Sequence, residues 1–219
     1  MYSQLGNATP KFSKRQVHLL VNYFNPPDED RQIEINKCLR ANVRLKTFHR
    51  IHVLVGPGTA LPDWIENPRI RVTQIDTDRV TYQGFFDYAN EKLPKRAIAV
   101  IINADIACTP SINYLRRYVT NTQCVALRRW EYVKKEWTLI PINSSQDLWA
   151  LEVPIAKLDE PADFELGVPG CDNLIAFMLD KHYTIKNPAK TVITYHIHKS
   201  GERSYGPRLK GRIKRVNIE

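Results

Sequence analysis

The chain has 219 residues and a formal net charge of +9 at pH 7, with 43% hydrophobic and 25% charged residues. Its longest apolar run falls far short of the roughly 20 residues that a membrane-spanning helix needs. The first residues, MYSQLGNATPKFSKRQ, lack the apolar core of a secretory signal. We therefore expect a cytoplasmic protein without a transmembrane segment, whose positive charge favours an anionic partner.

The length suits one large domain, and no repeat or low-complexity tract divides the chain. We expect an N-terminal extension at 1–16, one domain at 17–200 and a basic tail at 201–219. The tail is either simply solvated or a peripheral contact with a membrane surface. Four cysteines lie far apart among apolar neighbours and form no CxxC pair, which predicts reduced, buried thiols. They are Cys38, Cys108, Cys124 and Cys171.

Strands and helices alternate through the first half of the chain. Apolar runs bounded by turn residues predict strands at 17–24, 50–56 and 97–102, and an alternating pattern predicts another at 69–75. Apolar residues at helical spacing predict two helices between them, at about 31–45 and 81–93. This alternation predicts an α/β fold with a mostly parallel central sheet flanked by helices.

The regularity weakens beyond Pro110. Apolar patterns in this half predict helices at 112–119 and 171–182 and strands at 124–133, 147–154 and 190–198. We therefore expect the second half to be a mixed C-terminal extension of the same sheet.

Two oxygen-bearing side chains follow the fourth predicted strand, in the sequence AIAVIINADIACTP. Ligands of open α/β sheets bind beyond the carboxyl ends of the strands, where Asn103 and Asp105 are expected to lie. Two such side chains, separated by one residue, suit a hard divalent cation. An aspartate near a strand end also commonly forms a turn or caps a helix, and this alternative stays open for Asp105.

A pair of histidines ends the last predicted strand, in the sequence YHIHKS. The two-residue period of a strand places the imidazoles of His196 and His198 on one face, which favours a functional role. The alternative is a pair of half-buried histidines that neighbouring groups satisfy.

Two aspartates are candidates for proton transfer. Asp172 follows the turn GVPG at the start of a predicted helix, and Asp147 precedes a predicted strand in SQDLW. A carboxylate inside a cleft can accept the proton of a substrate hydroxyl. Either aspartate can instead be an N-cap residue, since Asp is among the best helix caps.

The ordered set NADI, SQDLW, GVPGCDN, NP and YHIHKS resembles the GT-A type glycosyltransferases, which are nucleotide-diphospho-sugar transferases. The similarity spans residues from about 17 to 205 and is greatest to small sugar-transfer domains of bacteria and large DNA viruses. It implies a single Rossmann-like GT-A domain with a DxD-type motif, Asn103-Ala104-Asp105, in which Asn replaces the first acidic residue. It also implies Mn²⁺ or Mg²⁺ held by Asp105 and His198, with His196 behind them.

The same resemblance implies a nucleotide-sugar site in which the end of the first strand holds the nucleobase and Arg79 approaches the diphosphate. A guanidinium suits phosphate oxygens, and an aromatic ring at a strand end can stack on a base. The alternatives are a packed aromatic side chain and a surface cation. The nucleotide-sugar-binding residues implied in this way are Asn22, Tyr23, Phe24, Arg79, Asn103 and Asp105.

Together these inferences predict a hexosyl or deoxyhexosyl transferase that uses a nucleotide diphosphate sugar, expected to be UDP-linked. The acceptor is expected to be a glycan, a lipid-linked sugar or another hydroxyl. The divalent cation neutralises charge on the departing diphosphate. Asp172, or Asp147, takes the acceptor proton, which gives inversion at the anomeric carbon. If no carboxylate lies near the acceptor, we expect a retaining course instead.

Other residues in the less regular half are candidates for contact with the acceptor. Trp130, Trp137 and Trp149 are either core residues or platforms on which a sugar ring stacks. Arg128 and Arg129, beside Trp130, face either the acceptor or solvent.

The main alternative function is a nucleic-acid-binding module that uses the basic surface and tail. The basic residues form no zinc-finger, RNP or recognition-helix motif, so we expect no nucleic-acid partner. A dinucleotide-dependent oxidoreductase ranks last, because NPPDED follows the first strand in place of a GxGxxG turn.

Overall fold

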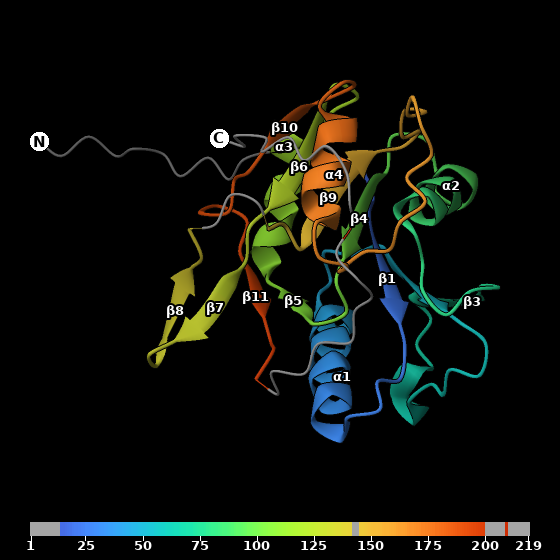
Figure 1. Ribbon diagram of the computed structural model, residues 1–219, viewed down its shortest axis with the longest axis vertical. Coiled ribbons are helices and arrows are strands. Elements are labelled where there is room, and N and C mark those ends of the chain that lie inside the picture. The colour runs from blue at the N-terminus through green and yellow to red at the C-terminus, as the bar shows by residue number, and fades with distance from the viewer. Residues whose placement is uncertain (1–13, 142–144, 200–208, 210–219) are drawn as a thin grey trace, which may run out of the picture.

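Within residues 14–141, 145–199 and Leu209, which the computed structural model describes, seven strands form the central sheet (Figure 1). Side by side they are β10 (Thr184–Lys186), β6 (Gln123–Leu127), β9 (Leu148–Glu152), β4 (Ile98–Ile102), β1 (Val17–Tyr23), β2 (Arg50–Val55) and β3 (Ile70–Gln74). Strand β9 runs antiparallel to β4 and β6, and the other neighbouring pairs are parallel. The mostly parallel α/β sheet expected from the sequence is confirmed.

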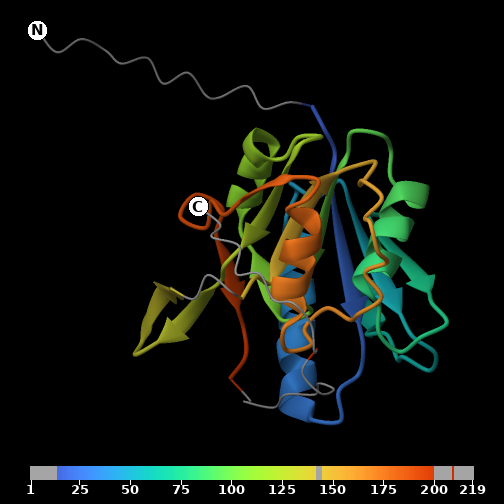
Figure 2. The same ribbon diagram turned by 45° about the horizontal axis from the view of Figure 1, so that its top comes forward.

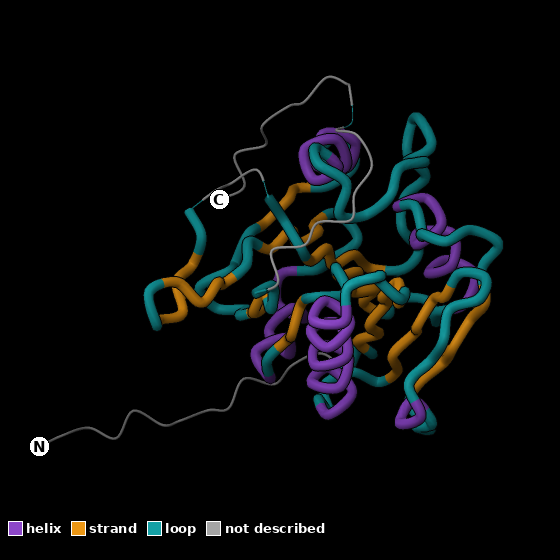
Figure 3. The backbone as a smooth tube through the Cα atoms, turned by 60° about the horizontal axis from the view of Figure 1, so that its bottom comes forward, coloured by secondary structure: helices purple, strands orange, loops and turns teal. Residues whose placement is uncertain are grey.

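Helices cover both faces of this sheet (Figure 3). Alternate residues of β1 belong to two different cores: Leu20 packs in the cluster that contains Phe85, whereas Leu19 packs in the one that contains Ile35. A strand buried on both faces has a continuous apolar sequence, which explains the uninterrupted runs seen in β1 and β4. The helices are α1 (Glu29–Arg44), α2 (Tyr82–Lys92), α3 (Leu115–Tyr118) and α4 (Cys171–Leu179), with 3₁₀ turns η1 (Asp63–Ile65) and η2 (Pro110–Tyr114).

Side-chain caps determine where α1 and α2 begin. Asp28 accepts a hydrogen bond from the backbone N–H of Arg31 at 2.7 Å, and Thr81 accepts one from the N–H of Gly84 at 3.1 Å. Such caps satisfy backbone amides that have no partner within the helix. Helix α1 therefore starts two residues earlier than expected, with acidic residues in the first turn that stabilise the helix dipole.

The second half of the chain extends the central sheet as expected, through β6, the antiparallel β9 and β10, but within the described residues it also contributes strands to a second sheet of four strands. The strands of this second sheet, in order, are β5 (Ile106–Cys108), β11 (Thr194–His196), β7 (Trp130–Val133) and β8 (Glu136–Leu139). The expected strand 124–133 is in fact two strands, β6 in the first sheet and β7 in the second. The expected strand 190–198 is shortened to β11. Apolar alternation cannot show that a chain leaves one sheet for another, which is why the expectation that 124–133 and 190–198 lie wholly in the first sheet was wrong.

The four cysteines are free and buried, as expected. Burial raises the pKa of each thiol, so that all four stay protonated at neutral pH.

None of the helices in the described part of the chain is both long and apolar enough to cross a bilayer. Residues 1–13 and, apart from Leu209, the basic tail at 201–219 lie outside the described residues. The expected domain boundaries, the cytoplasmic location and the contact of the tail with a membrane therefore remain predictions.

A chain of hydrogen-bonded side chains crosses the parallel strands β1, β2 and β3. Nδ1 of His18 lies 3.0 Å from Nε2 of His52, whose Nδ1 lies 3.0 Å from the hydroxyl of Tyr88. That hydroxyl is 3.1 Å from Oγ1 of Thr73. Burial, with nearby positive charge, lowers the pKa of His18 to about 3 and that of His52 to about 4. Both imidazoles are neutral in the folded protein at pH 7.

Acidification is expected to destabilise the fold through these two histidines. Their folded-state pKa values lie below the unfolded value of about 6.5, so stability is full above pH 6.5 and falls as the pH drops below it. Between pH 7 and pH 5 the free energy of unfolding should decrease by about 2–4 kcal/mol, measured by urea denaturation. The variant His52→Gln should flatten this dependence. The control variant His182→Gln, at a histidine outside this chain of hydrogen bonds, should keep it, and equal slopes for both variants would contradict the assignment.

Candidate active site

A cleft of about 1240 Å³ opens at the carboxyl ends of β1 and β4. Ligands of open α/β sheets bind in this place, because the loops that follow parallel strands converge there. The cleft brings together segments that are far apart in the sequence. The predicted site residues that line it are Phe24, Arg79, Asn103, Asp105, Asp147, Asp172, His196 and His198.

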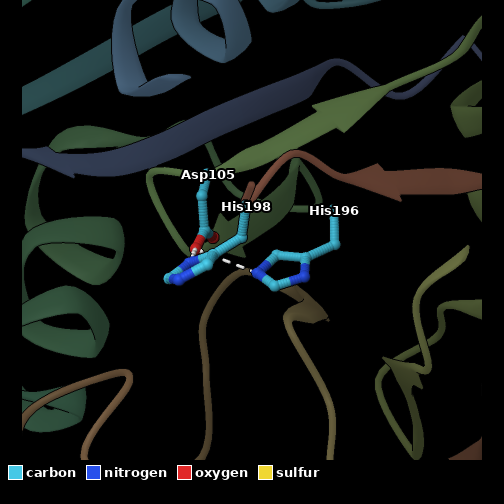
Figure 4. Close-up of side chains that lie close together, drawn as sticks. All are labelled: Asp105, His196 and His198. Carbon is cyan, nitrogen blue, oxygen red and sulfur yellow. Dashed lines mark hydrogen bonds and ion pairs between the residues drawn. The ribbon is translucent and has the colours of Figure 1, made fainter. Parts of the chain in front are cut away.

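Asp105 lies in the tight turn between β4 and β5, and the imidazoles of His196 and His198 point toward its carboxylate (Figure 4). Oδ2 of Asp105 is 3.1 Å from Nε2 of His196 and 3.7 Å from Nδ1 of His198. The two rings stack with centroids 5.3 Å apart, as two residues on one face of an extended chain can. The antiparallel pairing of β11 with β5 holds this arrangement, because it sets His196 opposite Ile106.

Positive and hydrogen-bonding groups surround the buried carboxylate of Asp105. Nη2 of Arg31, from α1, lies 2.6 Å from its Oδ2. Burial favours the protonated acid, but hydrogen bonds to His196 and His198 and the charge of Arg31 hold the pKa of Asp105 well below its usual range. Burial acts to lower the pKa of His196, and Asp105 outweighs it and raises that pKa. Asp105 is therefore ionised at neutral pH, as a metal ligand must be.

Two buried atoms of this cluster, Oδ1 of Asp105 and Nε2 of His198, have no hydrogen-bond partner among the described residues. Buried polar atoms are normally satisfied, so such exceptions indicate a missing partner. One ligand atom each from Asp105, His196 and His198 lies within 4.8 Å of the others, which fits a single metal ion. Imidazoles suit transition metals whereas Mg²⁺ prefers oxygen, so the set fits Mn²⁺ better than Mg²⁺.

Glu131 and Arg129 connect the histidines to Asp147. Oε1 of Glu131 is 3.2 Å from Nδ1 of His196 and 2.6 Å from Nε of Arg129. Nη1 of Arg129 donates to Oδ2 of Asp147 at 2.7 Å. His196 is therefore held between two carboxylates, Asp105 on one nitrogen and Glu131 on the other. A partner on the second nitrogen fixes the orientation of a metal-binding imidazole.

Asn103 is linked to Asp147 and is not part of the histidine cluster. Its Nδ2 donates to Oδ1 of Asp147 at 2.7 Å, and its backbone N–H donates to the Asp147 carbonyl at 3.2 Å. An aspartate at position 103 would place a second negative charge against Asp147 and would lose this donor. The neighbouring carboxylate thus explains why asparagine occupies the first position of the NAD sequence.

Asp172 lies in the first turn of α4, on the wall of the cleft. The N-cap is Gly170, whose φ of 95° favours glycine, so the alternative of Asp172 as the N-cap is wrong. Burial and the negative charge of Asp147 raise the pKa of Asp172 to about 8, despite hydrogen bonds from Cys171 and the backbone of Gln146. A carboxyl group that titrates near neutral pH is suited to proton transfer.

Phe24 and Arg79 form a second polar and aromatic corner of the cleft. The guanidinium carbon of Arg79 lies 3.9 Å from the centroid of the Phe24 ring. Nη2 of Arg79 also donates to the carbonyl of Leu166 at 3.4 Å. Burial lowers the pKa of Arg79 from its usual value, so the side chain is a desolvated cation beside the cleft. Such a cation suits an anionic ligand.

Asn22 and Tyr23 do not line the cleft, unlike the other predicted site residues. The amide of Asn22 donates to the carbonyl of Leu54 at 3.1 Å and accepts from the N–H of Val80 at 3.2 Å. The hydroxyl of Tyr23 donates to a side chain of α1, Asn36, at 2.8 Å. These bonds hold the loops and the helix around the end of β1.

Sequence reasoning missed Arg31 and Glu131 and left Arg129 between two interpretations. Arg31 faces the cleft from α1, and nothing in its local sequence distinguishes it from the other basic residues of that helix. Glu131 belongs to β7, which the sequence predicts only as the end of a longer strand at 124–133. Its position between Trp130 and Tyr132 is the one local signal, because neighbouring side chains of a strand point to opposite faces of the sheet.

No family model matches the chain, and no curated protein matches it. Solved structures resemble it at low identity. The 4-diphosphocytidyl-2C-methyl-D-erythritol synthase from Anaerococcus prevotii is 13% identical over 79% of this chain and 86% of its own, with a TM-score of 0.43. The 2-C-methyl-D-erythritol 4-phosphate cytidylyltransferase from Francisella tularensis is 12% identical over 63% of this chain and 70% of its own, with a TM-score of 0.38.

A third structure, the manganese complex of Rv0371C from Mycobacterium tuberculosis, is 10% identical over 80% of this chain and 88% of its own, with a TM-score of 0.46. At these scores the likenesses assign no family and no activity to this chain.

Proposed function

We propose that the chain is a metal-assisted glycosyltransferase that moves a sugar from a nucleotide diphosphate sugar, UDP-linked, to an acceptor hydroxyl. One observation supports this most directly. A set of metal-binding donors, Asp105, His196 and His198, shares a cleft with a carboxyl group, Asp172, whose pKa is raised toward neutral. Sugar transfer from a diphosphate needs both a charge-neutralising site and a proton acceptor.

On the donor side, Asp105, His196 and His198 would hold a divalent cation, Mn²⁺ in preference to Mg²⁺. The cation supplies neutralisation of the charge that builds on the departing diphosphate. Arg79 adds a fixed positive charge on the same side of the site, and its guanidinium can bind two phosphate oxygens. The Phe24 ring, which lines the cleft beside Arg79, would contact the nucleoside.

On the acceptor side, Asp172 accepts the proton of the acceptor hydroxyl as the oxygen attacks the anomeric carbon. The bond from this carbon to the phosphate oxygen breaks, and its electron pair leaves with the nucleoside diphosphate. Attack opposite the leaving group gives inversion. Asp147 is bound by Arg129 and Asn103, so it acts by positioning these groups and by raising the pKa of Asp172.

The test compares nucleotide sugars with and without Mn²⁺ on the purified chain. We expect UDP-sugars with Mn²⁺ to raise the melting temperature, and either component alone to raise it much less. Slow release of UDP should accompany binding. Pyrophosphate release from a nucleoside triphosphate, without UDP release from any UDP-sugar, would indicate nucleotidyl transfer instead. Tight, steeply salt-dependent binding of nucleic acid without a nucleotide-sugar effect would favour a nucleic-acid-binding module.

Removing the carboxylate that orients His196 is expected to weaken metal binding. The variant Glu131→Gln should bind Mn²⁺ about 10–100-fold more weakly, because the charged partner of Nδ1 is lost. Isothermal titration calorimetry measures the affinity directly. Glu136→Gln, on the exposed neighbouring strand β8, is the matched control and should bind Mn²⁺ like the wild type. Equal affinities for all three proteins would show that Glu131 has no role at the metal site.

A further inference from the structure

Arg129 lies where the chain passes from the central sheet into the second sheet. It belongs to the two-residue link between β6 and β7, at the base of the β7–β8 hairpin, which projects from the body of the protein (Figure 2). The carbonyl of Arg129 accepts from the N–H of Ile140, just after β8, at 3.2 Å. The carbonyl of Leu127, at the end of β6, accepts from the N–H of Asp147 at 3.1 Å. Hydrogen bonds therefore hold the backbone on both sides of the Arg129 side chain.

The guanidinium of Arg129 contacts two carboxylates at once. Its Nε lies 2.6 Å from Oε1 of Glu131, and its Nη1 donates to Oδ2 of Asp147 at 2.7 Å. Nη1 also donates to Oγ of Ser145 at 2.8 Å. The side chains of Arg129 and Asp147 are only 20% and 9% exposed, so solvent screens this contact weakly. A guanidinium donates in several fixed directions within one plane, so it fixes the two carboxylates relative to each other.

The two carboxylates belong to different parts of the candidate site. Oε1 of Glu131, the atom that Arg129 contacts, also lies 3.2 Å from Nδ1 of His196. His196 is one of the three candidate metal ligands. Asp147 and Asp172 both line the cleft, and the negative charge of Asp147 acts on the Asp172 carboxyl. One guanidinium thus joins the group that orients a metal ligand to the group that faces the candidate base.

We propose that Arg129 is a positioning residue that couples the candidate metal site to the proton-transfer site. Through Glu131 it sets the orientation of the His196 ring. Through Asp147 it sets the charge that faces Asp172. A change at either carboxylate moves the guanidinium and is therefore felt at the other, and a coupling of this kind is reciprocal. This inference rests on the proposed glycosyl transfer and concerns the regulation of that site.

The groups around Asp172 determine the direction of the effect on the proton-transfer side. Burial and the negative charge of Asp147 raise the pKa of Asp172 to about 8, whereas the positive charge of Arg129 opposes this rise. Loss of the Arg129 charge should therefore raise the pKa of Asp172, and loss of the Asp147 charge should lower it. The groups that face the Asp172 carboxyl are Arg129, Asp147, the backbone of Gln146, Cys171 and, from α2, Tyr82, whose hydroxyl lies 4.0 Å from Sγ of Cys171.

A double-mutant cycle tests the metal side, with Mn²⁺ affinity measured by calorimetry on the full chain. Glu131→Gln should cost about 10–100-fold in affinity when Arg129 is present. In Arg129→Gln the Glu131 carboxylate has lost the partner that holds it, so the same change should cost less than about threefold. Arg129→Lys keeps the charge but offers a single ammonium, so the cost there should be intermediate. The control background is Arg44→Gln, at the exposed end of α1 and outside the cleft, where the cost should equal that in the wild type.

The titration of Asp172 tests the proton-transfer side without any turnover. ¹³C NMR of the aspartate carboxyl carbons follows this titration, and Asp172→Asn identifies the signal. The midpoint should move to higher pH in Arg129→Gln and stay close to that of the wild type in Arg129→Lys, because only the first change removes the charge. Glu131→Gln keeps Arg129 and should move the midpoint less than Arg129→Gln does.

A smaller cost of Glu131→Gln in the Arg129→Gln background, together with the higher titration midpoint of Asp172, supports the coupling. An equal cost in the wild type and in both Arg129 variants, or an unmoved midpoint in Arg129→Gln, overturns it and leaves the proposed transferase in place. If Arg129→Gln does not fold, a wild-type cost in Arg129→Lys overturns it. If both sides respond to Arg129 but UDP-sugars are not turned over, the coupling stands and the transferase assignment fails. Absence of Mn²⁺ binding by the wild type overturns the metal site, and the coupling with it.

Discussion

The variant Asp172→Asn is expected to lower the rate of sugar transfer by about 10²–10⁴-fold, the usual contribution of a general base. The amide keeps the size of the side chain but cannot accept a proton. Binding of UDP and Mn²⁺ should be unchanged, since Asp172 has no contact with Asp105, His196 or His198 among those the structure shows. Loss of kcat without loss of donor affinity is the signature of a group that acts only in the chemical step.

Release of UDP from a UDP-sugar, in the presence of an acceptor, measures this rate, and melting curves measure donor binding. Asp163→Asn is the matched control, because Asp163 is exposed and lies outside the cleft. It should behave like the wild type. Turnover of Asp172→Asn at the wild-type rate would exclude Asp172 as the base.

The pH dependence of the wild type gives a second view of the same residue. A base must be ionised to act, so kcat/KM should fall as the pH drops through the raised pKa of Asp172, near pH 8, and not near the ordinary carboxyl value of about 4. Asp147→Asn removes the negative charge that raises this pKa and frees Arg129, which lowers it. The profile of that variant should move to lower pH. An unshifted profile would mean that another group titrates.

The parallel half of the fold is predictable from the sequence because β1, β2 and β4 are buried on both faces. The edge strand β3 is mostly exposed and is indicated instead by its alternating pattern. In β1 and β4 the apolar runs are continuous, and the helices between strands carry regular apolar spacing and side-chain caps. These are local signals, and they fixed the ends of the elements to within a few residues. The second sheet has no such signal. Strands β7 and β8 are mostly exposed, so their sequences lack the alternation that burial imposes.

The residues of the candidate site also differ in how far local sequence indicates them. Asp105, His196 and Asp172 were found because polar residues at the ends of apolar segments are conspicuous in a sequence. Arg31 and Glu131 were not, because their importance comes from tertiary pairing: one reaches Asp105 across 74 positions of the chain, and the other reaches His196 across 65. Charged residues within a helix or an exposed strand usually face solvent, and only the packing shows that these two do not.

The largest effect on metal binding is expected for Asp105→Asn. This change removes the only carboxylate among the three ligands, so we expect the affinity for Mn²⁺ to fall beyond detection by calorimetry and the Mn²⁺-dependent stabilisation by UDP to disappear. The change also leaves Arg31 and His196 facing a neutral group in a buried place. Removal of one partner from a buried ion pair costs about 3–5 kcal/mol, so the metal-free variant should be less stable by an amount of this order.

The double variant Arg31→Gln/Asp105→Asn separates these two effects. In Asp105→Asn the guanidinium of Arg31 keeps only Glu34 as an ionic partner among the described residues, so its removal should restore part of the lost stability, measured by urea denaturation. Mn²⁺ binding stays absent because the ligand is still missing. Arg31→Gln alone should bind Mn²⁺ more tightly than the wild type, since the guanidinium at 2.6 Å competes with a cation for the same Oδ2. Wild-type Mn²⁺ affinity in Asp105→Asn would exclude the three-residue metal site. Weaker Mn²⁺ binding by Arg31→Gln would mean that the guanidinium, on α1, holds the Asp105 carboxylate in the orientation that binds the metal.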